Sequence, residues 1–223
     1  MSTTGIWAVV PVKNFERAKT RLAGSLPPTR RRQFCRAMLC DTLKALRDAP
    51  SLGGIVVVTN DPDAIDIARS YGADVLNDPN ESGPSAAVSL GAQWLAKIES
   101  CTGMFAVMAD TPLVTADELQ SVLTNHGPAP AVTLIPARDG IGTNAAICSP
   151  TNVIALCFDG KSFPLHRKLA KMRGAEVNIV RMASFGLDID TAEDLSAFLA
   201  TPSNTLAAKE LAADADVLTE ISA

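Results

Sequence analysis

Two aspartates near the C-terminal end of the chain have the spacing of a divalent-cation site. Asp188 and Asp190 are two residues apart and follow an apolar run. In an extended strand, residues two apart face the same side, so these carboxylates would repel unless a cation compensates them. Thr191 can cap a following helix. Paired carboxylates at a strand end suit Mg²⁺, which prefers oxygen ligands; a solvated acidic turn with a helix cap is the alternative.

A third carboxylate follows another apolar run. Residues 104–109 predict a buried strand, and Asp110 comes directly after it. Pro112 keeps the residue before it out of the helical region, which can fix the direction of Asp110. Ligands of open α/β sheets bind beyond the carboxyl ends of the strands. We therefore expect Asp110 to converge with the two later aspartates on one Mg²⁺ site.

Basic residues follow the first predicted strand, 6–12. Four cations lie within nine residues there: Lys13, Arg17, Lys19 and Arg21. At a strand-to-helix turn such a cluster suits a triphosphate, whereas a solvated basic loop is the alternative. No G-x-G-x-x-G follows the strand, which disfavours a dinucleotide cofactor. The run 160–162 resembles the end of a P-loop, but position 155 is alanine where that motif needs glycine.

Three glycine-containing turns could hold anions through backbone N–H groups. Gly83-Pro84-Ser85 precedes a predicted helix. The segment 139–144 separates two apolar runs, so a hairpin turn is the alternative there. The segment 158–163 precedes His166 at the start of a further helix. Each turn alone is weak evidence for a binding site.

Strand and helix patterns alternate along the chain, which predicts an α/β fold with a mostly parallel central sheet and helices on both faces. Short apolar runs predict strands at 6–12, 55–59, 73–76, 104–109, 131–136, 145–148 and 176–182. Amphipathic spacing and capping residues predict helices at 28–48, 62–71, 84–97, 163–173 and 191–200, with one more after Thr115.

The length of 223 residues fits one domain over residues 1–200 and a helical tail over 201–223. The tail could be a docking helix, a dimer contact or a frayed end. A net charge of −4 argues against nucleic-acid and membrane-surface binding, and no apolar run could span a bilayer. Five cysteines without a C-x-x-C pattern indicate reduced thiols in the cytoplasm. Neither histidine has a cysteine at zinc-finger spacing.

The motifs occur in a fixed order. They are Val-Pro-Val-Lys-Asn-Phe-Glu-Arg-Ala-Lys-Thr-Arg-Leu at 10–22, Asp110-Thr-Pro-Leu, Gly142-Thr-Asn-Ala, Ser162-Phe-x-x-His166, and Leu187-Asp-Ile-Asp-Thr-x-Glu-Asp-Leu. In this combination the chain resembles, over about residues 6–200, the 2-phospho-L-lactate guanylyltransferase family of deazaflavin coenzyme F-420 biosynthesis.

The resemblance implies a Rossmann-like nucleotidyltransferase fold and a cytoplasmic, Mg²⁺-dependent enzyme. It would join GTP to 2-phospho-L-lactate, phosphoenolpyruvate or 3-phospho-D-glycerate, release pyrophosphate, and pass its product to a deazaflavin transferase. The implied metal ligands are Asp110, Asp188 and Asp190. The implied nucleotide-binding residues are Lys13, Lys19, Arg21, Gly83 and Ser85, and Lys13, Arg21 and Asp110 would be catalytic. The implied acid-binding residues are Thr143, Asp159, Gly160 and Ser162.

The chain departs from the family pattern at three places. The family usually has Asp-Leu-Pro where this chain has 110–112, Phe-Gly-x-x-Ser where it has 158–162, and Gly-Leu-Asn where it has 83–85. Asp159 would repel an anionic acid unless it points away or accepts a hydrogen bond from a substrate hydroxyl, which 3-phospho-D-glycerate has. There are two alternative functions. One is another nucleotidyltransferase that forms a nucleoside-diphosphate product, and the other is a non-catalytic nucleotide-sensing domain.

Overall fold

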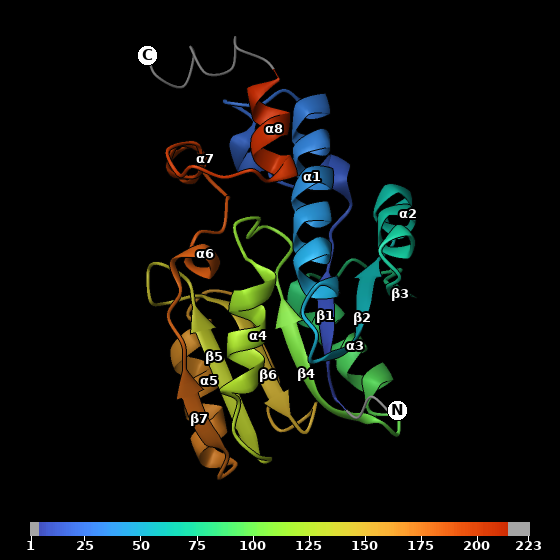
Figure 1. Ribbon diagram of the computed structural model, residues 1–223, viewed down its shortest axis with the longest axis vertical. Helices are drawn as coiled ribbons and strands as arrows, with labels where there is room; N and C mark the ends of the chain where they lie inside the picture. The colour runs from blue at the N-terminus through green and yellow to red at the C-terminus, as the bar shows by residue number, and fades with distance from the viewer. Residues whose placement is uncertain (1–4, 214–223) are drawn as a thin grey trace.

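The computed structural model describes residues 5–213, which form a seven-stranded mixed sheet in the order β3-β2-β1-β4-β6-β5-β7 (Figure 1). β6 alone runs antiparallel to its neighbours β4 and β5; the other paired strands are parallel. The bounds are β1 Gly5–Pro11, β2 Leu52–Thr59, β3 Asp74–Asn77, β4 Cys101–Val107, β5 Ala131–Pro136, β6 Thr143–Ser149 and β7 Glu176–Ile179.

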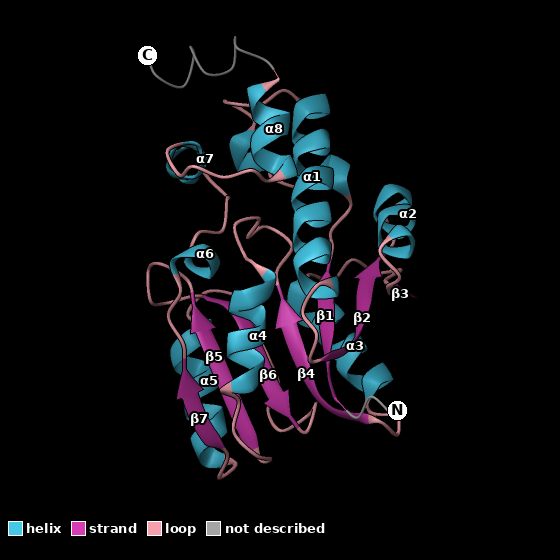
Figure 2. Cartoon of the chain, in the orientation of Figure 1, coloured by secondary structure: helices cyan, strands magenta, loops and turns pink. Residues whose placement is uncertain are grey.

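Helices cover both faces of the sheet, because each central strand is apolar on both sides (Figure 2). One buried cluster joins the sheet to α1 Pro28–Arg47, α2 Pro62–Ser70, α4 Ala116–Thr124, α6 Ala183–Gly186, α7 Ala192–Leu199 and α8 Leu206–Ala212. The second cluster joins the other face to α3 Pro84–Leu95 and α5 Ser162–Met172. The predicted α/β fold with a mostly parallel sheet is confirmed.

A glycine lets α3 lie close to the sheet. A Cβ atom at Gly91 would lie 2.5 Å from Cγ1 of Val9 in β1, closer than real side-chain contacts. The absence of a side chain therefore sets how near α3, and with it the turn before the helix, approaches the central strands.

One local prediction needs correction, and one open alternative is resolved. Residues 187–190 are not the end of a strand: β7 ends at Ile179, and the short helix α6 precedes them. Their position comes from one backbone hydrogen bond, in which the N–H of Ile189 donates to the carbonyl of Asp110 at 3.2 Å. The turn at 139–142 joins β5 to β6 as a hairpin, which was the open alternative for that segment.

The described part of the tail forms α8, which lies beside α1 (Figure 1). Asp41 of α1 accepts hydrogen bonds from the N–H groups of Leu206 and Ala207, both at 2.8 Å. Leu211 is buried against the same core, whereas Leu218 and Ile221 lie outside the described residues. The domain boundary at residue 200 and a dimer contact stay predictions. No helix within residues 5–213 is long and apolar enough to cross a membrane.

Candidate active site

The basic loop after β1 is held in place by Asp61, the residue that follows the neighbouring strand β2 and caps α2. The loop contains two single turns of 3-10 helix, η1 Phe15–Arg17 and η2 Thr20–Leu22. Asp61, which follows β2 and caps α2, also accepts a hydrogen bond from the N–H of Phe15 at 2.9 Å. One buried carboxylate thus fixes both the next helix and the basic loop, which places the cations near the carboxyl ends of β1 and β2.

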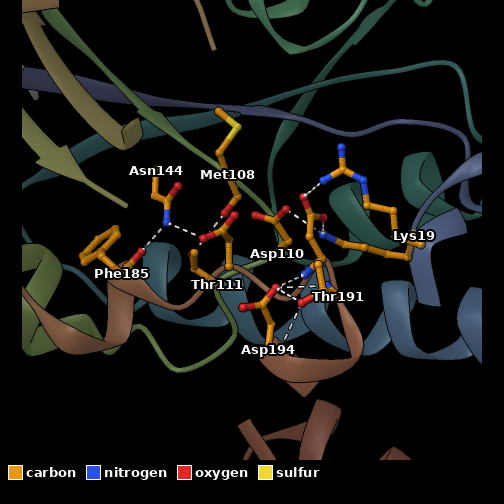
Figure 3. A network of polar contacts seen from close by, with 11 residues as sticks. Lys19, Met108, Asp110, Thr111, Asn144, Phe185, Thr191 and Asp194 are labelled. Atoms are coloured by element: carbon orange, nitrogen blue, oxygen red, sulfur yellow. Dashed lines mark hydrogen bonds and ion pairs between the residues drawn. The ribbon is translucent and has the colours of Figure 1, made fainter. Parts of the chain in front are cut away.

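Lys19 joins the basic loop to two of the predicted acidic residues (Figure 3). Its Nζ lies 2.7 Å from Oδ2 of Asp110 and 2.7 Å from Oδ1 of Asp190. The Lys19 side chain is 9% exposed, and its backbone φ of 51° lies in the left-handed region, which is uncommon for a residue with a Cβ. Arg21 lies farther out, with Nη1 at 3.9 Å from Oδ2 of Asp190.

Burial and the charged neighbours shift the pKa values of Lys19, Asp188 and Asp190. Burial alone would lower the pKa of Lys19, but Asp110 and Asp190 outweigh it and raise the pKa above its ordinary value. Burial likewise opposes ionisation of Asp190, yet Lys19 and Arg21 bring its pKa below the usual range. The pKa of Asp188 is raised, first by burial and then by the charge of Asp110.

Asp188 and Asp190 are oriented by different neighbours, among them Asn144 and Asp194, which are labelled in Figure 3. Asn144, at the start of β6, donates from Nδ2 to Oδ1 of Asp188 at 3.0 Å and to the carbonyl of Phe185 at 2.8 Å. Asp190 is followed by the capping box of α7, in which the side chains of Thr191 and Asp194 cap each other's backbone N–H groups. The helix start therefore fixes the backbone at Asp190.

Part of the acidic cluster formed by Asp110, Asp188 and Asp190 suits Mg²⁺. Within residues 5–213, no group of three or more His, Cys, Asp or Glu side chains is arranged to hold a metal ion. However, Oδ1 of Asp110 is buried without a hydrogen-bond partner, and Asp188 is near enough to feel its charge. Mg²⁺ usually binds one or two carboxylates and completes its coordination with water and substrate phosphates. Asp110, which keeps Oδ1 without a partner, and Asp188 fit that description, whereas both oxygens of Asp190 face cations, Lys19 and Arg21.

A cavity of about 560 Å³ opens beside this network, a size typical of small-ligand sites. The predicted site residues that line it are Lys13, Lys19, Arg21, Gly83, Asp110 and Asp190. A larger cavity of about 990 Å³ lies between α1, α6 and α7, and none of the predicted site residues lines it. The smaller cavity is therefore the candidate active site.

The predicted acid-binding hydroxyls form a buried network around His166. The Ser162 hydroxyl donates to Oγ1 of Thr143 at 3.1 Å, and that oxygen lies 3.1 Å from Nδ1 of His166. Nε2 of His166 accepts from the N–H of Cys157 at 2.9 Å, so Nδ1 carries the proton of the neutral ring. Burial lowers the pKa of His166 to about 4.

Ser85 and Asp159, predicted to bind different substrates, contact each other. The Ser85 hydroxyl donates to Oδ2 of Asp159 at 3.0 Å and accepts from the N–H of Phe158 at 2.9 Å. Asp159 therefore faces the start of α3. Gly160 lies in the same turn with a φ of 55°, which glycine adopts without strain. The contact ties the 158–160 turn to the 83–85 turn.

Sequence reasoning did not assign site roles to three residues that shape the site: Asp61, Asn144 and His166. Asn144 and His166 stood inside recognised motifs, so their position in those motifs was the available signal. Asp61 looked like an ordinary helix cap, and its second hydrogen bond depends on the pairing of β1 with β2.

Several known proteins are similar to this chain in sequence. The family model described as "Guanylyl transferase CofC like" matches residues 6–213. The phosphoenolpyruvate guanylyltransferase of Conexibacter woesei is 35% identical over 192 residues, 86% of each chain. The 2-phospho-L-lactate guanylyltransferase of Methanothermobacter thermautotrophicus is 31% identical, covering 84% of this chain and 81% of that one. The 3-phospho-D-glycerate guanylyltransferase of Colwellia psychrerythraea is 31% identical, over 87% and 92%.

Solved structures share the fold at low identity. A chain from Desulfovibrio desulfuricans G20, described as a proposed nucleotide-diphospho-sugar transferase, has a TM-score of 0.76 at 16% identity and covers 99% of both chains. A nucleotidyl transferase from Methanothermobacter has a TM-score of 0.62 at 17% identity, over 87% of this chain and 95% of that one. With the match of the family model over residues 6–213, the fold and the relatives show that this chain belongs to the CofC-like guanylyl transferase family.

Proposed function

We propose that this protein transfers the guanylyl group of GTP to the phosphate of a three-carbon phosphorylated acid and releases pyrophosphate. The observation that carries the proposal is Lys19, which lies 2.7 Å from both Asp110 and Asp190 at a cavity that Lys13 and Arg21 also line. Cations and carboxylates at one cavity suit a nucleotide triphosphate with its metal ion. The names of the relatives give the guanylyl group as the group transferred and a three-carbon phosphorylated acid as the acceptor.

The chemistry is an in-line displacement at the α-phosphorus of GTP. A phosphate oxygen of the acid forms the new bond to phosphorus, and the bond to the β-phosphate oxygen breaks, so pyrophosphate leaves with that electron pair. The attacking phosphate is already anionic at neutral pH, so no general base is needed. The chain contributes position and charge: Lys13, Lys19 and Arg21 neutralise phosphate oxygens, and the turns at 83–85 and 158–162 hold the two substrates.

The proposal includes Mg²⁺ as the resident ion, held by Asp110 and Asp188 with Asp190 next to them. When bound, Mg²⁺ would neutralise developing charge on the phosphates. The buried, unpartnered Oδ1 of Asp110 supports this assignment. Asn144 keeps Asp188 directed toward the cluster through its 3.0 Å hydrogen bond.

The family places the reaction in coenzyme F-420 biosynthesis, and we propose that a deazaflavin transferase uses the product. The cytoplasm is the proposed location, because all five cysteines are unpaired thiols, as is usual in a reducing compartment.

Pyrophosphate release tests the proposal. The purified protein is mixed with GTP, Mg²⁺ and each acid in turn: 2-phospho-L-lactate, phosphoenolpyruvate and 3-phospho-D-glycerate. Release with one acid and GTP is the expected result and identifies the acceptor. The same panel with CTP, UTP and ATP is the control for the donor. Release with another nucleotide alone would indicate a different nucleotidyltransferase, and nucleotide binding without release would indicate a sensing domain.

A further inference from the structure

Glu81 combines three features that the proposed chemistry does not use. It lines the same cavity as Lys19, its Oε2 lies 2.9 Å from Nη2 of Arg17, and its Oε1 is buried without a hydrogen-bond partner. The Glu81 side chain is only 13% exposed. A carboxylate oxygen removed from water and left unpartnered is destabilising unless a donor arrives to bind it.

The backbone at Glu81 is also unusual. Its φ of 43° lies in the left-handed region. Among the described residues, Lys19 and Glu81 are the two non-glycine residues with a positive φ, and both line the candidate active site. Backbone conformations of this kind concentrate at functional sites. The loop therefore holds this carboxylate in place at a cost in local stability.

The Arg17 ion pair does not explain that arrangement. The Arg17 side chain is 66% exposed, so its ion pair with Glu81 adds little stability. It does restrain Oε2, one of the two oxygens of Glu81. The second oxygen, Oε1, has no hydrogen-bond partner, and the residue lines the cavity.

The other residues near the cavity are weaker candidates for hydrogen bonding to a nucleotide base. The turn at 83–85 has no asparagine amide, and the Ser85 hydroxyl is already engaged by Asp159 and Phe158. Pro84 and Ala87 add apolar surface to the cavity, on which a flat base can pack. Among the described residues that line the cavity, two have a buried oxygen without a hydrogen-bond partner, Glu81 and Asp110. Asp110 belongs to the acidic cluster, so Glu81 is the candidate for contacting the base.

We infer that Glu81 selects the base of the nucleotide by accepting hydrogen bonds from two adjacent donors on guanine. Guanine presents N1–H and the 2-amino group side by side. Adenine and cytosine place a ring acceptor beside their amino group, and uracil has a single N–H between two carbonyls, so a carboxylate disfavours all three. This inference rests on the proposed use of GTP and adds the residue that makes guanine the preferred base.

The test compares GTP with ITP, whose base lacks only the 2-amino group. In the wild type we expect GTP to be favoured over ITP by about tenfold to a hundredfold in kcat/KM, as for hydrogen bonds to a charged group. Glu81→Gln should lower kcat/KM for GTP by a similar factor and bring the GTP-to-ITP ratio close to one. The same ratio is measured by calorimetric binding of each nucleotide without an acid.

Control variants separate this role from a structural one. Glu16→Gln changes an exposed carboxylate in the adjoining turn η1 and should leave the ratio unchanged. If Glu81→Gln weakens GTP and ITP equally, Glu81 has only a structural role and the inference is wrong. A ratio that collapses in Asp78→Asn but not in Glu81→Gln would assign base selection to Asp78, which lines the same cavity, and would also overturn the inference.

Binding without an acid also separates the inference from the proposed function. If the wild type binds no GTP, both fail. If it binds GTP in preference to ITP and Glu81→Gln keeps that preference, only the role of Glu81 fails. Thermal unfolding of each variant confirms that the comparison is made between folded proteins.

Discussion

Lys19 places an ammonium group between two carboxylates at the centre of the candidate active site. Both contacts are 2.7 Å long, and both partners outweigh the effect of burial on the pKa of Lys19, so the side chain is charged throughout the physiological range. Such a preorganised charge needs no rearrangement when phosphate charge develops nearby. Lys19 thus holds Asp110 and Asp190 together, and under the proposed function it also presents a cation to the nucleotide.

Removal of that charge should impair turnover much more than it changes the fold. We expect Lys19→Met to lower kcat by about 10² to 10³, the usual effect of deleting one preorganised electrostatic group. The measurement is steady-state pyrophosphate release with saturating GTP and acid. Lys19→Arg, which keeps the charge, should retain more activity than Lys19→Met. The control is Lys44→Met, which removes an exposed lysine paired with Asp48 on α1; near-normal kcat in Lys19→Met would refute the assignment.

The candidate site could be predicted in part from residue types and spacing. Lys19, Asp110 and Asp190 were singled out from the sequence, and the structure brings them together. The position of Lys19 between two carboxylates was not predictable, because it depends on contacts across 91 and 171 residues. The unpartnered oxygen of Glu81 was equally hidden, since it depends on the loop geometry rather than on any motif.

At the scale of elements, apolar runs located the strands because buried parallel strands must be apolar on both faces. The antiparallel direction of β6 could not be derived from its composition, since it follows from the tight turn at 139–142 and from pairing with two neighbours. The extended segment 187–190 looked like a strand end, but its hydrogen bond goes to the Asp110 loop instead of a sheet edge. The spacing of apolar residues does not by itself show in which direction a strand runs, or whether an extended segment pairs with the sheet at all.

Helix α8 depends on a carboxylate from another helix. Asp41 accepts hydrogen bonds from two N–H groups in the first turn of α8. The N–H groups of a first turn have no carbonyl partner within their own helix. We expect Asp41→Ala to destabilise the protein by about 1 to 2 kcal/mol, the usual effect of losing a helix cap. Hydrogen exchange should show the loss of protection at 206–212 before the rest of the chain.

The matched control is Asp48→Ala, directly after α1, which removes a carboxylate paired with exposed Lys44 and Arg47. Its effect should stay within about 0.5 kcal/mol, as for most surface positions. If both substitutions destabilise the protein equally, or if Asp41→Ala leaves exchange at 206–212 unchanged, the cap does not hold α8 in place.

At the scale of the whole molecule, two polar networks start at adjacent residues of β6. Thr143 and Asn144 begin β6, where Thr143 contacts His166 and Asn144 contacts Asp188. His166 also holds the backbone at Cys157, so α5, the 157–162 segment and the sheet are linked through one neutral ring. Protonation of that ring would break its acceptor role toward Cys157. The fold and the site are therefore expected to respond to acid together.

The pH dependence of stability has a definite sign at His166. Its pKa is about 4 in the folded protein, against about 6.5 in the unfolded chain, so the unfolded state binds more protons between these values. The contribution of His166 is therefore fully present above pH 6.5 and declines as the pH falls toward 4, by about 3 kcal/mol in total. His166→Asn is less stable at pH 7, but its stability should decline less over that range.

Urea unfolding from pH 7.5 to pH 4 in wild type and His166→Asn measures the difference directly. His126→Asn is the control, because burial also lowers the pKa of His126 but its ring contacts Thr133 and Ser149 at the other end of β6. It should flatten the profile less than His166→Asn does. Parallel profiles for wild type and His166→Asn would mean that His166 titrates alike in both states, and that the buried network does not couple the fold to pH.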